Sequence, residues 1–336
     1  MPSDVQPNTR RGGSMRVSLT ILLVGFCACS EPTPSAQPTP PGPVVDAAPA
    51  RRAVPPPTYM DVAAERRVIA IGDVHGDQRA ARSALRLAGV IDANDNWSGS
   101  QDIVVQVGDQ LDRGDDERSI LVWFAQLADQ AFEAGGGFYA LNGNHETMNV
   151  SLDFRYVTPG GYEDFADVPV PADPEIDQLP LSEQGRAAAF RPGGPFALML
   201  AEQNTVMVVG RNVFVHGGVL PQHFGRGLRN INADVQAWMR GELGKPSAIR
   251  GDESLVWSRH FSRDTTPEHC ALLAETLDLA GADRMIVAHT VQDGGINSVC
   301  GEQVWRVDVG LAAHYGGSTE VLEIQGDVVR ILSTGG

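Results

Sequence analysis

Three times in its first half, this chain ends a short apolar run at a glycine, and side chains that can bind metal follow at once. The apolar runs are 68–71, 103–107 and 138–141, and the motifs after them read GDVHG at 72–76, GDQLDRG at 108–114 and NGNHE at 142–146. Short apolar runs bounded by glycine are typical of buried strands, and glycine lets the backbone turn sharply where each strand ends. The chain therefore predicts a sheet with polar ligands gathered along one edge.

The spacing of these motifs indicates parallel strands. Asp73, Asp109 and Asn144 are 36 and 35 residues apart, close to the roughly 30-residue length of a strand–helix–strand unit. The stretches between them, 77–87 and 115–134, have helical character, and each begins near an aspartate. Parallel strands present their following loops at one edge, so six side chains should converge there: Asp73, His75, Asp109, Asp112, Asn144 and His145. Unpaired carboxylates would repel one another at this edge, so a cation is expected among them.

Taken together, the motifs resemble those of the calcineurin-like metallophosphoesterases, specifically the phosphoprotein phosphatase branch. Longer strings resemble the Shewanella-like protein phosphatases of bacteria and plants: VGDQLDRGDDE at 107–117, NGNHETMN at 142–149, FVHGGVLP at 214–221 and VWRVDVG at 304–310. The resemblance covers about residues 66–332, and several motifs in order are far more specific than any single one. It implies an α/β fold, the four-layer αββα sandwich of metallophosphoesterases with an inserted lid.

The resemblance also implies two divalent cations, with Asp109 bridging them. The implied ligands are Asp73, His75 and Asp109 for the first cation and Asp109, Asn144, His216 and His289 for the second. Two neighbouring cations need a shared anion, and mixed nitrogen and oxygen ligands suit Mn²⁺, Fe or Zn²⁺ better than Ca²⁺. Mn²⁺ is the first expectation. For a histidine that ends an apolar strand, as His216 and His289 each do, the alternative is an ordinary buried core residue.

The implied activity is hydrolysis of phosphate monoesters on proteins, by in-line attack of a hydroxide that bridges the two metals. His145, oriented by Asp112, is expected to protonate the leaving oxygen, and Arg113 is expected to hold the phosphate. Arg259 is a second candidate for phosphate binding, and its alternative is a surface ion pair. Two other functions stay open: a bis(5'-nucleosyl)-tetraphosphatase-like nucleotide hydrolase, and a non-catalytic phosphate-binding protein on the same fold.

The formal net charge of the chain is -16, which leaves little basic surface for a nucleic acid. A phosphorylated protein or a small phosphomonoester is the expected substrate. Residues 1–29 resemble a bacterial lipoprotein signal, with arginines before an apolar run at 17–26 that is too short to cross a bilayer, and then Cys29 as the expected lipid acceptor. An ordinary signal peptide cut nearby is the alternative. The implied location is the bacterial periplasm or cell envelope, with membrane contact only through that lipid.

The rest of the chain divides into a tether, a domain and an insertion. Residues 30–61 are rich in proline and alanine and predict a disordered tether, and 62–334 predict the catalytic domain. Within that domain, 151–203 are rich in proline and glycine, with one helix-like patch at 182–190, and predict an irregular lid over the metal site. Arg155, Tyr156 and Phe165 are candidates for contacting substrate there, with packing against the core as the alternative.

The second half predicts a strand pair, two helices and a final group of strands. The expected ranges are 205–209 and 212–215 for the pair, 228–242 and 267–280 for the helices, and 284–288, 303–309, 320–325 and 328–332 for the later strands. Cys270 and Cys300 are the two cysteines outside the signal. Export would place them in an oxidising compartment, so a disulfide between them is expected, with two reduced buried thiols as the alternative.

Overall fold

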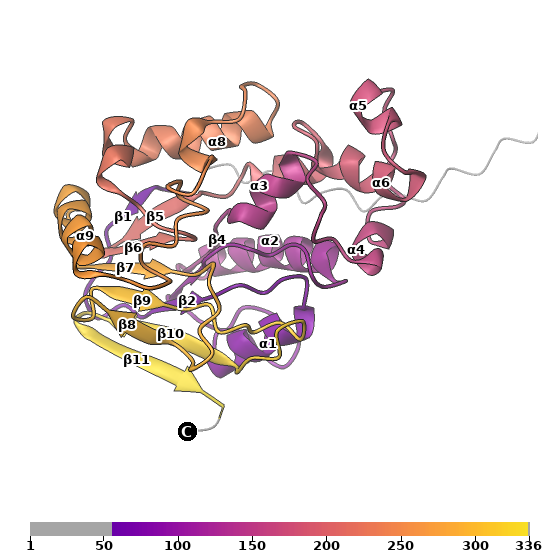
Figure 1. The fold of residues 1–336 in the computed structure, drawn as a ribbon. Coiled ribbons are helices and arrows are strands. Elements are labelled where there is room, and N and C mark those ends of the chain that lie inside the picture. The colour runs from indigo at the N-terminus through magenta and orange to yellow at the C-terminus, as the bar shows by residue number, and fades with distance from the viewer. Residues whose placement is uncertain (1–55, 335–336) are drawn as a thin grey trace, which may run out of the picture. The chain divides into compact units, whose positions relative to one another are not determined.

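The computed structural model of the protein describes residues 56–334 (Figure 1). The predicted signal peptide, the expected lipid acceptor Cys29 and the part of the predicted tether up to residue 55 lie outside the described residues. Within 56–334, no helix combines the length and the apolar character that crossing a bilayer requires.

One sheet has five strands in the order β11-β10-β2-β3-β4. Three adjacent strands are parallel, as the motif spacing predicts: β2 (Val68–Ile71), β3 (Ile103–Gln106) and β4 (Gly137–Ala140). β10 (Glu320–Gln325) and β11 (Val328–Ser333) complete the sheet as an antiparallel pair. The three loops that carry the first motifs therefore leave this sheet at the same edge.

A second sheet has six strands in the order β1-β5-β6-β7-β9-β8. It consists of β1 (Tyr59–Met60), β5 (Val206–Val209), β6 (Asn212–Val215), β7 (Arg284–Val287), β9 (Val304–Arg306) and β8 (Asn297–Val299). β6, β7 and β9 are parallel, so this sheet too presents a triplet of strand ends at one edge. β1 pairs with β5, so the chain joins the fold before residue 62, where the sequence predicts that the domain begins.

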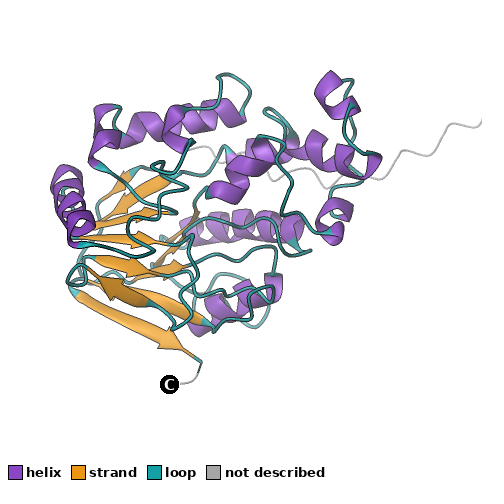
Figure 2. Ribbon diagram, viewed as in Figure 1, coloured by secondary structure: helices purple, strands orange, loops and turns teal. Residues whose placement is uncertain are grey.

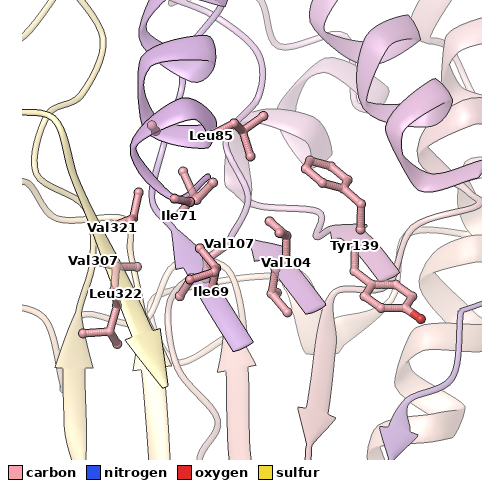
Figure 3. Close-up of a cluster of buried hydrophobic side chains, with 14 of the residues drawn as sticks. Ile69, Ile71, Leu85, Val104, Val107, Tyr139, Val307, Val321 and Leu322 are labelled. Atoms are coloured by element: carbon pink, nitrogen blue, oxygen red, sulfur yellow. The ribbon is translucent and has the colours of Figure 1, made fainter. Parts of the chain in front are cut away.

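Alternate residues of the second sheet face two different apolar clusters. Phe214 and Ile286 pack with the five-stranded sheet and with helices α1 (Gln78–Leu87) and α2 (Glu117–Glu133). Their neighbours Val213 and Met285 pack with helices α8 (Leu228–Met239) and α9 (Pro267–Ala280). Figure 2 shows the strands gathered together with helices around them, and Figure 3 shows part of the first cluster. The order is helix, sheet, sheet, helix, which is the expected four-layer α/β architecture.

The insertion 151–203 is more regular than its composition suggests. It contains α4 (Pro159–Glu163), α5 (Pro174–Asp177), α6 (Leu181–Phe190) and α7 (Pro195–Leu200), whereas the sequence predicts only the third of these. Three of the four helices begin with proline. Proline suits a first helical turn, because the amide hydrogen that it lacks has no partner there. These prolines therefore start helices, and reading them as marks of irregular chain was wrong.

In the described part of the chain, three short helices lie outside the insertion. α3 (Asn144–Val150) begins inside the NGNHE motif, and η1 (Pro221–Gly225) and η2 (Ser247–Ile249) are single 3₁₀ turns. A disulfide joins Cys270 of α9 to Cys300 just after β8, with the Cα atoms 5.4 Å apart. The predicted pairing is confirmed, and it closes a loop that contains His289.

Candidate functional site

The carboxyl ends of the two parallel strand triplets meet, and a buried polar cluster fills the place where they meet. Each strand delivers at least one residue soon after it ends. The cluster comprises Asp73 and His75 after β2, Asp109 and Asp112 after β3, Asn144 and His145 after β4, His216 after β6, His289 after β7 and Asp308 after β9. All nine side chains are buried, and all but Asp308 are predicted from the sequence as site residues.

Asp109 lies at the centre of this cluster. Its Oδ2 atom is 3.1 Å from His216 Nε2, 3.7 Å from His145 Nε2 and 3.9 Å from His75 Nε2. Burial alone would raise the pKa of Asp109, but His216 and His145 hold it well below its usual value. One carboxylate oxygen thus faces ring nitrogens from both sheets, which is the position that a bridging metal ligand requires.

A second group of donor atoms surrounds His216. Its Nε2 lies 2.9 Å from Asn144 Oδ1 and 3.2 Å from His289 Nδ1. Among residues 56–334, two sets of three side chains have donor atoms close enough together to hold a cation: Asp109 with His216 and His289, and Asp109 with His75 and His145. His145 therefore lies among the possible ligands by distance alone, although the sequence assigns it to acid catalysis.

The donor atoms fit divalent cations in their chemistry as well as their placement. Burial and the nearby His145 lower the pKa of His75 to about 3, and burial and His216 hold the pKa of His289 well below its usual value. Both rings are therefore neutral and can donate a lone pair. Asp73 Oδ1 and His289 Nε2 are buried and have no hydrogen-bond partner within residues 56–334. A metal ion would occupy donors of this kind.

Asp308 is the member of the cluster that the sequence reasoning missed. Burial, Asp308 and Asp109 together raise the pKa of Asp73 well above its usual value, and burial likewise raises the pKa of Asp308. Two adjacent buried carboxylates cannot both stay ionised without a compensating positive charge. The available signal was the VWRVDVG motif, in which Asp308 follows an apolar strand in the same way as the other site residues.

His145 and Asp112 form a hydrogen-bonded pair beside the cluster. His145 Nδ1 donates to Asp112 Oδ2 at 2.5 Å, which leaves Nε2 directed toward Asp109. Burial disfavours charge on His145, but Asp109 and Asp112 raise its pKa above the usual value. A histidine held in this way can carry a proton and deliver it from Nε2.

Two half-buried arginines, Arg113 and Arg259, lie beside the cluster. Arg113 Nη1 is 3.4 Å from His75 Nε2, and its Cζ atom lies over the rings of Tyr156 and Tyr315, 4.8 Å and 5.1 Å from their centroids. Arg259 donates to the carbonyl of His289 at 2.9 Å. Within the described part of the chain, neither guanidinium pairs with a carboxylate, so both can bind an anion.

Close backbone packing holds the ligand loops in register. Glu146 accepts hydrogen bonds from the backbone amides of Asp109 and Gly143, at 2.9 Å and 2.6 Å. A Cβ atom on Gly143 would lie 2.3 Å from Asp109 Oδ1, so only glycine fits where these two loops touch. The sequence reasoning gave no role to Glu146, whose buried carboxylate ties the loop after β3 to the loop after β4.

The three candidate substrate contacts in the insertion have different positions. Tyr156 is exposed and its ring lies 5.2 Å from that of His145, so it borders the site. Arg155 is exposed and pairs with Asp153 at 2.6 Å. Phe165 is fully buried in the second apolar cluster, so the packing alternative holds for it and its proposed contact with substrate was wrong.

Known proteins resemble this chain in sequence and in fold. Residues 66–293 match the family described as calcineurin-like phosphoesterase. The chain is 41% identical over 304 residues to Shewanella-like protein phosphatase 2 of Arabidopsis thaliana, covering 80% of this chain and 78% of that protein. It superposes on the cold-active protein-tyrosine phosphatase of a psychrophilic Shewanella species with a TM-score of 0.66 and 23% identity, covering 82% of each chain. A protein serine/threonine phosphatase from Saccharomyces cerevisiae superposes with a TM-score of 0.54 and 13% identity, covering 83% of this chain and 84% of that chain. The two structural similarities concern the fold alone.

Proposed function

Because this chain belongs to the calcineurin-like phosphoesterase family and is a metallophosphoesterase, as its motifs predict, we propose that it removes phosphate from phosphorylated proteins. The names of its relatives support a protein substrate: one is a Shewanella-like protein phosphatase and another is a protein-tyrosine phosphatase. Phosphotyrosine, phosphoserine and phosphothreonine are the candidate residues.

The observation that carries the proposal is the position of Asp109. Its carboxylate faces histidines that follow strands of both sheets, and all of their facing nitrogens lie within 3.9 Å of Asp109 Oδ2. One carboxylate could therefore be shared by two cations. In this proposal two divalent cations are held by Asp73, His75, Asp109, Asn144, His216 and His289. Mn²⁺ is the first candidate because the ligands mix nitrogen and oxygen, and Fe and Zn²⁺ are the alternatives. When bound, such cations favour proton loss from water and offset charge on the phosphoryl oxygens.

The remaining residues bind the phosphate and supply the proton. Arg113 and Arg259 lie beside the cluster without a carboxylate partner in the described chain, so they can hold two phosphoryl oxygens. His145 donates its Nδ1 proton to Asp112 in a hydrogen bond, and its raised pKa favours a second proton on Nε2, which lies toward the same space. From there it can protonate the leaving oxygen, so that a poor leaving group such as a serine side chain departs as an alcohol.

The test is a direct comparison of substrates. Purified protein loaded with Mn²⁺ is incubated with phosphotyrosine peptide, phosphothreonine peptide and diadenosine tetraphosphate, and the products are measured. Release of inorganic phosphate from a peptide is expected. Cleavage of the nucleotide alone would establish the tetraphosphatase alternative, and binding of phosphate without any turnover would establish the non-catalytic one.

We also propose that the protein is exported to the bacterial periplasm or cell envelope and carries lipid on Cys29. The Cys270–Cys300 disulfide supports an oxidising compartment. Radioactive palmitate fed to a bacterial host should label the protein, and Cys29→Ala should remove the label. Cys27→Ala serves as the matched control, and it should keep the label. Unlabelled protein in the soluble periplasm would favour simple secretion.

A further inference from the structure

Arg186 places a charged group deep inside the protein, beside Asp112 of the buried polar cluster. It belongs to α6 of the insertion, and its side chain is 0% exposed. A buried guanidinium is costly unless nearly all of its hydrogen-bond donors are satisfied. Aromatic rings of Phe154, Phe165 and Phe190 lie around its Cζ atom at 5.1–5.9 Å and exclude water from it.

The donors of Arg186 are used on groups around the acid pair. Nε donates to Asn149 Oδ1 at 2.8 Å, and Nη2 donates to Asp112 Oδ1 at 3.2 Å. Nη2 also donates to Glu117 Oε1 at 2.8 Å, and Nη1 donates to the other oxygen of Glu117 and to the carbonyl of Gly161. The arginine therefore joins α2, α3 and the insertion at one point.

Asp112 has both of its carboxylate oxygens fixed by this arrangement. Oδ1 accepts from Arg186 and, at 2.9 Å, from Asn149 Nδ2, whereas Oδ2 accepts from His145 Nδ1. The backbone amide of Asp112 donates to Glu117, the main partner of Arg186. Without these contacts the carboxylate could rotate, and the imidazole that depends on it could rotate as well.

We propose that Arg186 is a positioning residue for the acid step: it holds Asp112 in the orientation that directs His145 Nε2 toward the leaving oxygen. The inference rests on the proposed function, because it needs His145 to act as an acid. The inference also gives the insertion a role in catalysis. Arg186, on a helix of the insertion more than 70 residues after Asp112 in sequence, then controls the orientation of the acid His145.

The competing explanation is that Arg186 only fastens the insertion to the core. The two explanations differ in what a substitution does to different substrates. Weaker fastening lowers the amount of folded enzyme and reduces turnover of every substrate equally. A misdirected His145 slows substrates with poor leaving groups far more than aryl phosphates, because a nitrophenolate departs without a proton.

Two variants test this difference. Arg186→Lys keeps the charge, but an ammonium cannot reproduce the planar fork that bonds Glu117 and Asp112 together. The double variant Arg186→Met with Glu117→Gln removes both buried charges at similar volume, which makes it the variant more certain to fold. Ile176→Ala is the matched control, because Ile176 is a buried apolar residue of α5 in the insertion and cannot form a hydrogen bond with Asp112.

For each variant, kcat is measured on p-nitrophenyl phosphate and on a phosphoserine peptide. Wild type and His145→Asn are measured in the same way as references, and circular dichroism checks that every variant is folded. In the two Arg186 variants we expect the peptide rate to fall at least about 10-fold more than the aryl rate, a smaller version of the His145→Asn effect. Ile176→Ala should change both rates by the same factor, and metal content should stay unchanged in all variants.

The possible outcomes distinguish a failure of the Arg186 inference from a failure of the proposed phosphatase function. Equal losses on both substrates in the Arg186 variants, with a selective loss in His145→Asn, would overturn the inference alone. No selectivity in His145→Asn would overturn the acid role and the inference together. A wild-type protein that releases no phosphate from either substrate would overturn the proposed function itself.

Discussion

Five residues of the candidate site have left-handed backbone that non-glycine residues seldom adopt. They are His75, Asp109, Asp112, Arg113 and His289, with φ between 41° and 68°. Each such residue costs about 1–3 kcal/mol and persists only where the surroundings enforce it. Here backbone bonds enforce it: the amides of Val74 and His75 both donate to the carbonyl of Asp109. The loops that carry these residues are therefore held in a strained conformation, which lowers the free energy of unfolding but orients their side chains into the candidate site.

His145 is the residue whose role is easiest to misassign, since it lies near Asp109 as a ligand would. His145→Asn should keep both metals and slow alkyl phosphates by about 10²–10⁴-fold, while p-nitrophenyl phosphate loses much less. Steady-state kinetics with elemental analysis of the same samples checks this. Loss of a metal with equal slowing of both substrates would make His145 a ligand instead.

The elements differ in how readily the sequence predicts them. α9 is predicted at its observed bounds, and in the structure Thr266 caps its start and Gly281 ends it in left-handed conformation. The parallel strands β2 to β4 follow from their glycine-ended apolar runs. Short helices that begin with proline could not be told from loops, because a proline that starts a helix looks the same in sequence as one that breaks it. The role of Arg186 was also hidden, because a lone arginine in a helix usually marks a solvated face.

The disulfide joins α9 to the chain after β8 and encloses the strand before His289. The two cysteines are 30 residues apart, for which the chain-entropy relation gives about 3–4 kcal/mol of unfolding free energy. Reduction, or the pair Cys270→Ala with Cys300→Ala, should lower the urea midpoint accordingly. Urea denaturation of the oxidised and reduced protein at the same pH measures it. An unchanged midpoint would mean that the bridge adds nothing to stability.

At the scale of the whole molecule, the candidate metal ligands come from both sheets. Asp73, Asp109 and Asn144 follow strands of one sheet, and His216 and His289 follow strands of the other. Cations held by these residues bind the folded chain and not the unfolded one. Metal binding should therefore stabilise the packing of the two sheets against each other, in addition to supporting hydrolysis.

Removing the metal should accordingly destabilise the protein. A ligand present at 100 times its dissociation constant adds about 2.7 kcal/mol to the free energy of unfolding. We expect dialysis against a chelator to lower the thermal midpoint and abolish hydrolysis, and added Mn²⁺ to restore both. Differential scanning calorimetry of the loaded, stripped and reloaded protein gives the comparison. A midpoint that does not respond to metal would argue that the cluster holds no cation across the two sheets.

Asp109→Asn tests the central claim most directly, because it replaces one buried carboxylate with an amide of the same shape. The measurement is the rate of p-nitrophenyl phosphate hydrolysis together with metal content by mass spectrometry, with Asp283→Asn, an exposed partner of Arg211, as the matched control. The dimetal account predicts that Asp109→Asn loses hydrolysis and bound metal while Asp283→Asn keeps both. Full activity with normal metal content in Asp109→Asn would contradict it.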